Sequence, residues 1–327
     1  YDTQKPGPGI FQPAGTNIEE GKNFVVNNSG FFGYFEGMKK QPFQLDFIRS
    51  KDFYGATGMR ADVNPPLLAS LSKEAEASKE KEVDRFKVEN YDLLVDSPLM
   101  YSKADTAIIR VANTDVLVAS YSPNNVVTAA EIAKSIKEVL EAQTAYLGGK
   151  LPVDKYAFVF YFTDQPVTSY GALEHSYSSI YYMPEQPIQQ MNQQLRDFAA
   201  HEFFHIVTPL NIHSEEIENF DFNEPEMSQH LWLYEGMTEY FAGNVQVKHN
   251  LISPQQYLNV IRGKILTSQS AYDDNLPFTV MSKGTLDEHA NQYGNVYQKG
   301  ALIGMSLDIT LNKLSNGTYG TQELMAE

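Results

Sequence analysis

The sequence predicts an α+β protein in which a β-rich region precedes a mixed region that ends in helices. Three patterns support this prediction. The first sixty residues alternate short aromatic and β-branched runs with glycine and proline turns, as in strands joined by tight turns. Residues 156–162 form a continuous apolar run of strand length. From Ile188 onward, apolar residues recur mostly at helical spacing.

The composition is that of a globular chain and excludes several classes of protein. Of the 327 residues, 42% are hydrophobic and 20% are charged, which suits a sizeable core. The net charge of -16 at pH 7 repels phosphate backbones, so we expect no nucleic-acid partner. No run of about 18 apolar residues occurs, so we expect no membrane span. The lack of cysteine excludes disulfides, a thiol nucleophile and a thiolate metal site.

The extent of the chain and its compartment are further expectations. The sequence begins at Tyr1 without an initiator methionine and stops within an expected helix, so we expect a piece of a longer protein. A chain without cysteine suits reducing and oxidising compartments alike, and the compartment is not determined. A periplasmic or secreted location is favoured over a cytoplasmic one.

We expect an incomplete β-rich N-terminal domain over residues 1–95. Strands are expected at 24–26 and 43–48, where aromatic and β-branched residues cluster. Residues 73–89 carry charges of both signs and few apolar side chains, which is typical of a solvated helix face or loop. The composition changes near residue 95, so a second domain is expected over 96–327, truncated at its C-terminus.

The second domain is expected to begin with strands and to become helical. Thr128 and Glu131 form a capping box, and apolar residues at helical spacing follow as far as Leu147. Gly148 and Gly149 can end this helix in the left-handed conformation. The expected elements are, in order, strands over 106–111 and 116–121, a helix over 128–147, and strands over 156–162 and 171–182.

One helical segment carries the pattern of a metal site. His201 and His205 stand four residues apart in the apolar stretch FAAHEFFHIV, so one helix face presents both imidazoles, with Glu202 beside them. A chain of this composition contains an HExxH pattern by chance roughly 0.01 times. Two histidines that hydrogen bond separately on a solvated helix would need no apolar flanks. We therefore expect one zinc ion per chain at this segment.

A catalytic zinc ion needs a third protein ligand and an open position for water. A third histidine six residues after His205 is excluded, because Asn211 stands there and His213 lies two positions too far along. The other option is a glutamate from a later helix. Glu235 provides it within the aromatic segment WLYEGMTEY, where a glycine follows it. His201, His205 and Glu235 are therefore the expected metal ligands.

Three motifs resemble those of the gluzincins, the HExxH-plus-glutamate zinc peptidases that include thermolysin and aminopeptidase N. They are HEFFH, WLYEGMTEY and GALEH, the last at residues 171–175. The chain is most similar to the glycyl aminopeptidase family, over roughly residues 90–327 and more weakly in the β-rich N-terminal part. The resemblance implies a thermolysin-like zinc peptidase domain with a mixed sheet and a helical lobe. It also suggests a PDZ domain beyond the C-terminal end of this chain.

The segment GALEH resembles the exopeptidase motif on the substrate-facing strand of aminopeptidase N relatives. By this resemblance Gly171 and Ala172 contact the substrate, and Glu174 binds the free α-ammonium group of a peptide. Holding that group places the scissile bond one residue away. The alternative is a strand carboxylate that faces water.

A further segment, YQKGA at residues 297–301, resembles a setting in which relatives of aminopeptidase N use a tyrosine to hydrogen bond the oxyanion. A phenol, with a pKa of about 10, is a neutral donor at pH 7. Tyr297 is the expected donor and Tyr293 is its rival. The alternative is that Tyr297 only packs at the start of a helix.

Two carboxylates are candidates for orienting the metal ligands. Asp197 stands four residues before His201, and Glu239 stands four residues after Glu235, so each shares a helix face with a ligand. Either can equally be a surface carboxylate.

In the family a Trp-Asn-basic segment commonly follows the HExxH motif. Here Pro209 is expected to end the helix close to the ligands, and the missing positive charge leaves the substrate preference open.

Together these expectations describe a zinc metallopeptidase. Glu202 is expected to accept a proton from the zinc-bound water and to pass it to the leaving amine, while zinc and Tyr297 stabilise the oxyanion. Glu174 makes the expected activity that of an aminopeptidase on peptides or proteins with a free N-terminus. The alternatives are a thermolysin-type endopeptidase with the same metal site and a catalytically silent peptide-binding relative. The preferred side chain and the oligomeric state stay open.

Overall fold

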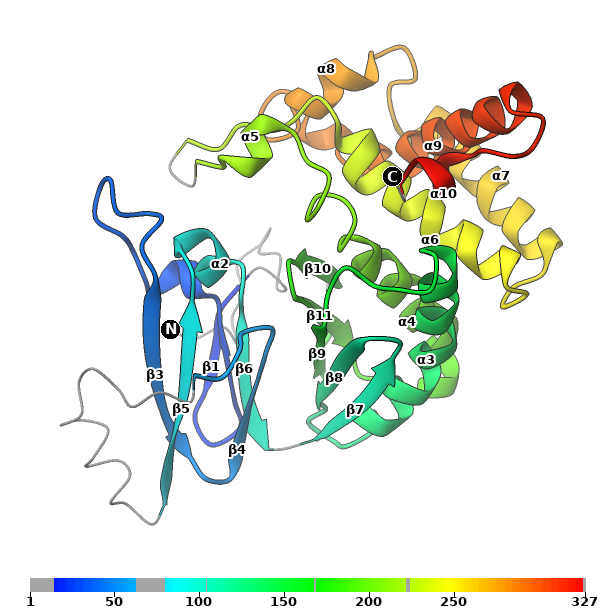
Figure 1. The fold of residues 1–327 in the computed structure, drawn as a ribbon. Coiled ribbons are helices and arrows are strands. Elements are labelled where there is room, and N and C mark those ends of the chain that lie inside the picture. The colour runs from blue at the N-terminus through cyan, green and yellow to red at the C-terminus, as the bar shows by residue number, and fades with distance from the viewer. Residues whose placement is uncertain (1–14, 63–79, 104, 168, 222–223, 326–327) are drawn as a thin grey trace. The chain divides into compact units, whose positions relative to one another are not determined.

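The computed structural model describes residues 15–62, 80–103, 105–167, 169–221 and 224–325 (Figure 1). The chain forms two compact units. The first comprises Tyr1–Ser135 and Val153–Asn192, and the second comprises Ile136–Pro152 and Gln193–Glu327. Strands dominate the first unit and helices the second, so the predicted α+β class with a β-rich beginning is confirmed. The predicted domain boundary near residue 95 stays a prediction.

The N-terminal part of the first unit is an antiparallel β structure. Its strands are β1 (Asn17–Glu19), β2 (Asn23–Val26), β3 (Phe43–Ser50), β4 (Phe53–Thr57), β5 (Lys81–Val88) and β6 (Leu99–Lys103), and its short helices are η2 (Asn28–Gly30) and α2 (Tyr91–Val95). One sheet has the order β1-β2-β6-β4, and β3 pairs with β5. The strands predicted at 24–26 and 43–48 lie within β2 and β3, because their aromatic and β-branched side chains pack into a common core.

Strand β5 corrects the interpretation of residues 73–89 as a solvated helix face or loop. Its charged residues pair with those of β3 across the ribbon. Arg49 Nε lies 2.6 Å from Asp84 Oδ2, and Arg85 Nε lies 3.8 Å from Asp46 Oδ1. Opposite charges on facing strands support pairing, so a charge-rich segment forms a strand here. Residues 73–79 lie outside the described part of the chain.

A five-stranded sheet completes the first unit, and Figure 1 shows its strands side by side. They are β7 (Thr106–Val111), β8 (Thr114–Tyr121), β9 (Lys155–Thr163), β10 (Gly171–His175) and β11 (Ser178–Pro184). The order is β10-β11-β9-β8-β7, and β9 is parallel to both of its neighbours. Its apolar run includes Phe158 and Phe160, which are fully buried, as expected for the centre of a sheet.

The single strand predicted over 171–182 is a hairpin. Strands β10 and β11 pair antiparallel on either side of a turn at Ser176 and Tyr177. Asp96 holds this turn, because its carboxylate accepts a hydrogen bond from Ser176 N at 2.8 Å and lies 2.9 Å from His175 Nδ1. Strand β10 is the last strand in the order of the five-stranded sheet, so it forms one edge of that sheet.

The predicted helix over 128–147 is confirmed as α3 (Ala129–Tyr146). The Thr128 hydroxyl donates to Glu131 Oε2 at 2.8 Å, and the glycines after the helix have φ of 81° and 89°. The second half of α3 packs against α4 (Ile188–Phe204), where Gln143 Nε2 donates to the carbonyl of Ala200 at 2.8 Å. This buried contact holds the end of α4 in place.

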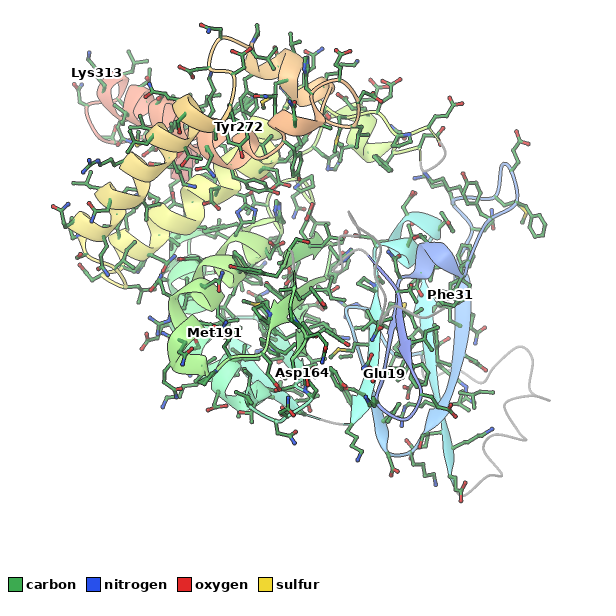
Figure 2. All side chains as sticks on the ribbon, turned by 180° about the vertical axis from the view of Figure 1, so that it is seen from behind. Glu19, Phe31, Asp164, Met191, Tyr272 and Lys313 are labelled. Carbon is green, nitrogen blue, oxygen red and sulfur yellow. The ribbon has the colours of Figure 1, made fainter. Side chains whose placement is uncertain are left out.

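The rest of the second unit is helical. Its elements are α5 (Glu215–Glu218), η3 (Trp232–Gly236), α6 (Met237–Lys248), α7 (Pro254–Ala271), α8 (Phe278–Lys283), η4 (Ala290–Gln292), α9 (Asn295–Leu314) and α10 (Thr321–Leu324). Figure 2 marks Tyr272, directly after α7, and Lys313, in the last turn of α9. Ser253 and Gln256 form the capping box that begins α7. In the described residues no helix combines the length and hydropathy needed to cross a bilayer.

Candidate metal centre

The end of α4 carries the two histidines of the HExxH segment. Ala199, Ala200 and Phe203 of this helix are completely buried, so the apolar flanks of the segment anchor it in the core. His201 and His205 are buried as well, and their ring centroids lie 5.0 Å apart. The spacing of four residues therefore brings the two imidazoles together, as the sequence predicts.

His205 lies one residue beyond the end of α4, which ends at Phe204 as expected near Pro209. Proline has no N–H group, so Pro209 cannot donate to the carbonyl of His205 as a helical residue would. Leu210 N donates to that carbonyl instead, at 3.3 Å. His205 Nδ1 donates to the carbonyl oxygen of Thr208 at 2.8 Å. The ring of His205 is thus oriented by its own turn.

Glu235 is presented by η3, a π-helical turn that leads into α6. Such turns are frequent at functional sites. The glycine after Glu235 has a steric purpose, because a Cβ atom on Gly236 would lie 2.5 Å from the backbone carbon of Gly300 in α9. Only a residue without a side chain lets η3 and α9 approach so closely. This contact brings α9, which carries Tyr297, against the turn that carries Glu235.

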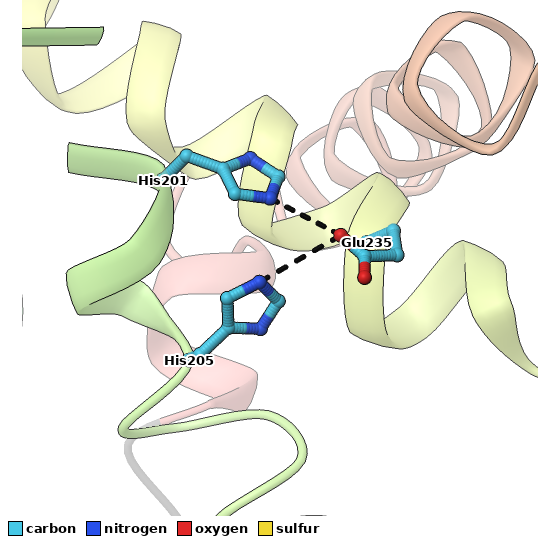
Figure 3. Close-up of side chains that lie close together, drawn as sticks. All are labelled: His201, His205 and Glu235. Carbon is cyan, nitrogen blue, oxygen red and sulfur yellow. Dashed lines mark hydrogen bonds and ion pairs between the residues drawn. The ribbon is translucent and has the colours of Figure 1, made fainter. Parts of the chain in front are cut away.

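The side chains of His201, His205 and Glu235 converge. Oε2 of Glu235 lies 3.1 Å from Nε2 of His201 and 3.6 Å from Nε2 of His205, and Figure 3 shows both rings turned toward this one oxygen. All three side chains are buried. Two ligands at about 2.0–2.1 Å from a tetrahedral zinc ion stand about 3.4 Å apart, so these separations suit a zinc ion.

The hydrogen bonds on the far side of each ring leave the near nitrogens suited to a cation. A carbonyl oxygen only accepts, so His205 carries its proton on Nδ1 and presents a lone pair at Nε2. This Nε2 is buried, faces a carboxylate oxygen, and has no hydrogen-bond partner among the residues that the structure describes. Two buried acceptors that face each other are unfavourable until a cation lies between them. Two imidazoles and a carboxylate form a donor set of catalytic zinc sites.

His201 is oriented by a carboxylate. Its Nδ1 donates to Oε2 of Glu239 at 2.8 Å. Burial lowers the pKa of His201, but the hydrogen bonds with Glu235 and Glu239 raise it, and the result is a pKa well above the ordinary value. Burial raises the pKa of Glu235, and the hydrogen bond with His201 lowers it to a value below the ordinary one. The site therefore attracts positive charge, as a proton or as a metal ion.

Glu239 also contacts a lysine. Nζ of Lys264, on α7, lies 2.6 Å from Oε1 of Glu239. Burial raises the pKa of Glu239, but the hydrogen bond with His201 and the charge of Lys264 lower it to about 2. Glu239 is therefore ionised, and its two oxygens serve two different partners.

Glu202 and two tyrosines complete the surroundings of the ligands. Glu202 is buried, and one of its carboxylate oxygens lies within 4.8 Å of a ring nitrogen of His205. The ring of Tyr297 lies 5.6 Å from the ring of His201, centroid to centroid. The hydroxyl of Tyr293 lies 3.1 Å from that of Tyr297. Of the two rival tyrosines, Tyr297 therefore packs against His201 and Tyr293 hydrogen bonds to Tyr297.

The other predicted carboxylate, Asp197, has different neighbours. Its Oδ1 accepts hydrogen bonds from Gln193 Nε2 at 2.9 Å and from Gln246 Nε2 at 2.8 Å. Burial raises the pKa of Asp197, and these hydrogen bonds lower it in part. Of the two candidates, Glu239 is thus the one that contacts an imidazole.

The predicted substrate-binding residues lie on β10 in the first unit. Gly171, Ala172 and Glu174 are all partly buried, and β10 pairs only with β11 among the described strands. Their contact with a substrate stays a prediction.

The groups that hold the two imidazoles in place were predicted only in part. The carbonyl of Thr208 and the side chain of Lys264 were not predicted. The only signal for Lys264 in the sequence is its spacing with Ile261 and Ser268, which places a lysine on the buried face of α7. The same spacing also occurs for a lysine whose aliphatic side chain only covers apolar surface, so it does not predict a role at the site.

Two family models match parts of the chain. Residues 9–103 match the family model of the peptidase M61 N-terminal domain, and residues 194–303 match that of the M61 glycyl aminopeptidase. The two models together cover more than half of the chain. A search of the curated proteins found no match.

Solved structures share the fold. An aminopeptidase N family protein from Idiomarina loihiensis matches with a TM-score of 0.75 and 19% identity, over 95% of this chain and 53% of that one. An M1 zinc metallopeptidase from Deinococcus radiodurans matches with a TM-score of 0.58 and 13% identity, over 98% of this chain and 65% of that one. A mutant of the Deinococcus protein, in a structure with a bound Tyr-Ser-Ala substrate, matches with a TM-score of 0.57, 14% identity and the same coverage. This chain spans about half to two thirds of these proteins.

Proposed function

The chain belongs to the M61 glycyl aminopeptidase family, and on this premise we propose that it is a zinc-dependent aminopeptidase that hydrolyses the N-terminal peptide bond of peptides. One observation carries the proposal. The buried lone pair of His205 Nε2 and the near nitrogen of His201 face the same oxygen of Glu235, an arrangement that a cation stabilises. His201, His205 and Glu235 would hold one zinc ion per chain. When bound, zinc supplies a Lewis acid and lowers the pKa of a water molecule.

The chain supplies a base and a hydrogen-bond donor for the reaction. Glu202, buried beside the ligands, accepts a proton from the attacking water at its carboxylate and returns it to the nitrogen of the leaving amine. Tyr297, whose ring packs against His201, donates its hydroxyl proton in a hydrogen bond to the oxyanion. One such donor is worth about 3 to 4 kcal/mol in other enzymes. Tyr293 would orient this hydroxyl through the hydrogen bond between the two phenols.

Glu174 is proposed to select the N-terminus of the substrate. Its carboxylate would pair with the free α-ammonium group, and Gly171 and Ala172 would contact the backbone of the peptide along the edge of β10. The family resemblance of the segment GALEH supports this assignment. A preference for glycine or other small first residues and a PDZ domain in the full-length protein also follow from the resemblance and stay predictions, as does the compartment.

Metal content and hydrolysis test the proposal. We expect purified protein to contain about one equivalent of zinc and to lose hydrolysis of aminoacyl amides after chelation, with recovery when zinc is added. The variant Glu202→Gln should keep the metal and lose about 10²- to 10⁴-fold in kcat. Protein that takes up no zinc would be a peptide-binding relative and would refute the proposal. Full turnover by Glu202→Gln would refute the assignment of the base.

The role of Glu174 needs a separate test. We expect Glu174→Ala to lose activity on peptides with a free amine and to gain none on amine-blocked peptides. The matched control is Glu141→Ala, which removes an exposed carboxylate from α3. Wild-type protein that cleaves blocked and free peptides equally well would be an endopeptidase.

A further inference from the structure

Lys264 is a lysine placed where lysines are rarely found. It lies in the middle of α7 and is 8% exposed. An ammonium group taken out of water is costly unless it is paired, so such a lysine indicates specific partners. Its Nζ lies 2.6 Å from Oε1 of Glu239 and 3.1 Å from the carbonyl oxygen of Tyr297. These partners belong to two other helices, α6 and α9.

The first partner, Glu239, contacts His201, a proposed metal ligand. Glu239 Oε1 contacts Lys264, and Glu239 Oε2 accepts the hydrogen bond of His201 Nδ1 at 2.8 Å. With one oxygen held by the ammonium group, the carboxylate cannot rotate without breaking its ion pair with the buried Lys264. The other oxygen is therefore kept in line with the imidazole. A carboxylate in this position sets the tautomer and the orientation of a ligating histidine.

The second partner is the backbone carbonyl of Tyr297, whose hydroxyl is the proposed hydrogen-bond donor to the oxyanion. The carbonyl that accepts from Lys264 belongs to Tyr297, in the first turn of α9, and the ring of Tyr297 packs against His201. The same ammonium group thus ties the start of α9 to α6. In the described residues no other lysine or arginine forms an ion pair with Glu239. The backbone contact between Gly236 and Gly300 also joins α9 to η3, but it carries no charge.

We propose that Lys264 is a positioning residue for the metal centre: it holds Glu239, which orients His201, and it holds the backbone of Tyr297. This inference rests on the proposed zinc site. Lys264 touches neither the ion nor the substrate, and it acts through the groups that do. The positive charge also balances that of Glu239, a partly buried carboxylate that contacts the same imidazole as a second carboxylate, Glu235.

Zinc affinity is the primary test, measured by competition with a chromogenic chelator. We expect Lys264→Met to weaken zinc binding about 10- to 100-fold, the range for residues that support metal ligands, and to lower kcat more than it raises KM. Lys264→Arg should recover part of both losses, because it keeps the charge. The matched control is Lys155→Met. Lys155 is a partly buried lysine of β9 whose Nζ donates to the carbonyl of Met59 at 2.6 Å, and its loss should leave zinc affinity unchanged.

A double variant tests the path of the effect. If Lys264 acts on zinc binding through Glu239, then Lys264→Met should add little to the loss of zinc affinity caused by Glu239→Gln. Two fully additive losses would contradict this path.

The outcomes separate the inference from the proposed function. Wild-type protein that binds no zinc refutes the function itself. Wild-type protein that binds zinc, with Lys264→Met binding it equally well, overturns only the role of Lys264. If Lys264→Met does not fold, Lys264→Gln is measured in its place. If both variants stay unfolded in excess zinc, Lys264 is a structural residue and the inference is wrong.

Discussion

The two histidines of the proposed metal centre are supported in different ways. Nδ1 of His201 donates to the carboxylate of Glu239, which in turn contacts Lys264. Nδ1 of His205 donates to the backbone carbonyl of Thr208, three residues away in its own turn. One ring is thus oriented by charged side chains from two other helices, and the other by neutral main chain.

This difference predicts how the support of each histidine responds to substitution. The partner of His201 is the side chain of Glu239, so a single substitution can remove it. How well Glu239 orients the ring also depends on the packing of α6 against α7. The partner of His205 is present in any sequence that keeps the turn. The support of His201 should therefore be sensitive to distant substitutions, and that of His205 should not.

The largest loss of zinc affinity is expected when Glu235, which both histidines face, is substituted. Glu235→Ala removes the oxygen that both near nitrogens face, so we expect zinc affinity to fall more than about 100-fold, beyond the range for supporting residues. Chelator competition and metal analysis of dialysed protein measure the loss. If Glu235→Ala retained one equivalent of zinc, Glu235 would not be a ligand.

A smaller effect is expected on the His201 side alone. Glu239→Gln keeps an acceptor for His201 Nδ1 but loses the charge, and we expect zinc affinity to fall about 10- to 100-fold. Asp197→Asn is the matched control. Asp197 shares a helix face with His201 but hydrogen bonds to Gln193 and Gln246, so zinc affinity should not change. Equal losses in the two variants would show that general charge, and not contact with the ring, matters.

On the His205 side a side-chain substitution should affect stability only. Thr208→Val keeps the carbonyl that orients His205 and removes a buried hydroxyl that donates to the carbonyl of Leu233 at 3.2 Å. We expect a loss of about 1 kcal/mol in the free energy of unfolding and no change in zinc affinity. Denaturant unfolding and chelator competition measure the two quantities. A marked loss of zinc affinity would show that His205 also depends on a side chain.

The smallest effect on the metal is expected for a carboxylate remote from both rings. Asp308 accepts hydrogen bonds from Thr321 N and from the hydroxyl of Tyr240, both at 2.7 Å. Burial raises the pKa of Asp308, but these hydrogen bonds lower it below the ordinary value. Such a carboxyl stabilises the fold above the unfolded-state pKa, about 4, and this contribution is lost as the pH falls through the lower, folded-state pKa.

Asp308→Asn should therefore lower Tm at pH 7, and its difference from wild type should shrink below about pH 4, with zinc affinity unchanged. Thermal unfolding over a pH series measures this. A difference in Tm that is constant with pH would mean that the charge of Asp308 contributes nothing.

Some elements could be predicted because their signals are local. The capping box of α3, the two glycines after it and the apolar run of β9 each depend on residues that are close in sequence, and each is confirmed. Strand β5 could not be predicted in this way, because its charges are neutralised by residues of β3 more than thirty positions away. The hairpin of β10 and β11 depends on Asp96, which lies about eighty residues before the turn.

The sequence by itself determined the α+β class, the pairing of two imidazoles at a spacing of four residues, and the family resemblance, since all three follow from periodicity and short motifs. Only the tertiary structure decided which groups hydrogen bond to Nδ1 of each imidazole and which residues hold those groups in place. Glu239, Lys264 and the start of α9 meet at His201 because α6, α7 and α9 pack together, and a close contact between Gly236 and Gly300 permits part of that packing. Spacing along one chain predicts which side chains share a face of an element. It does not predict which faces of different helices meet, because that depends on packing among residues far apart in sequence.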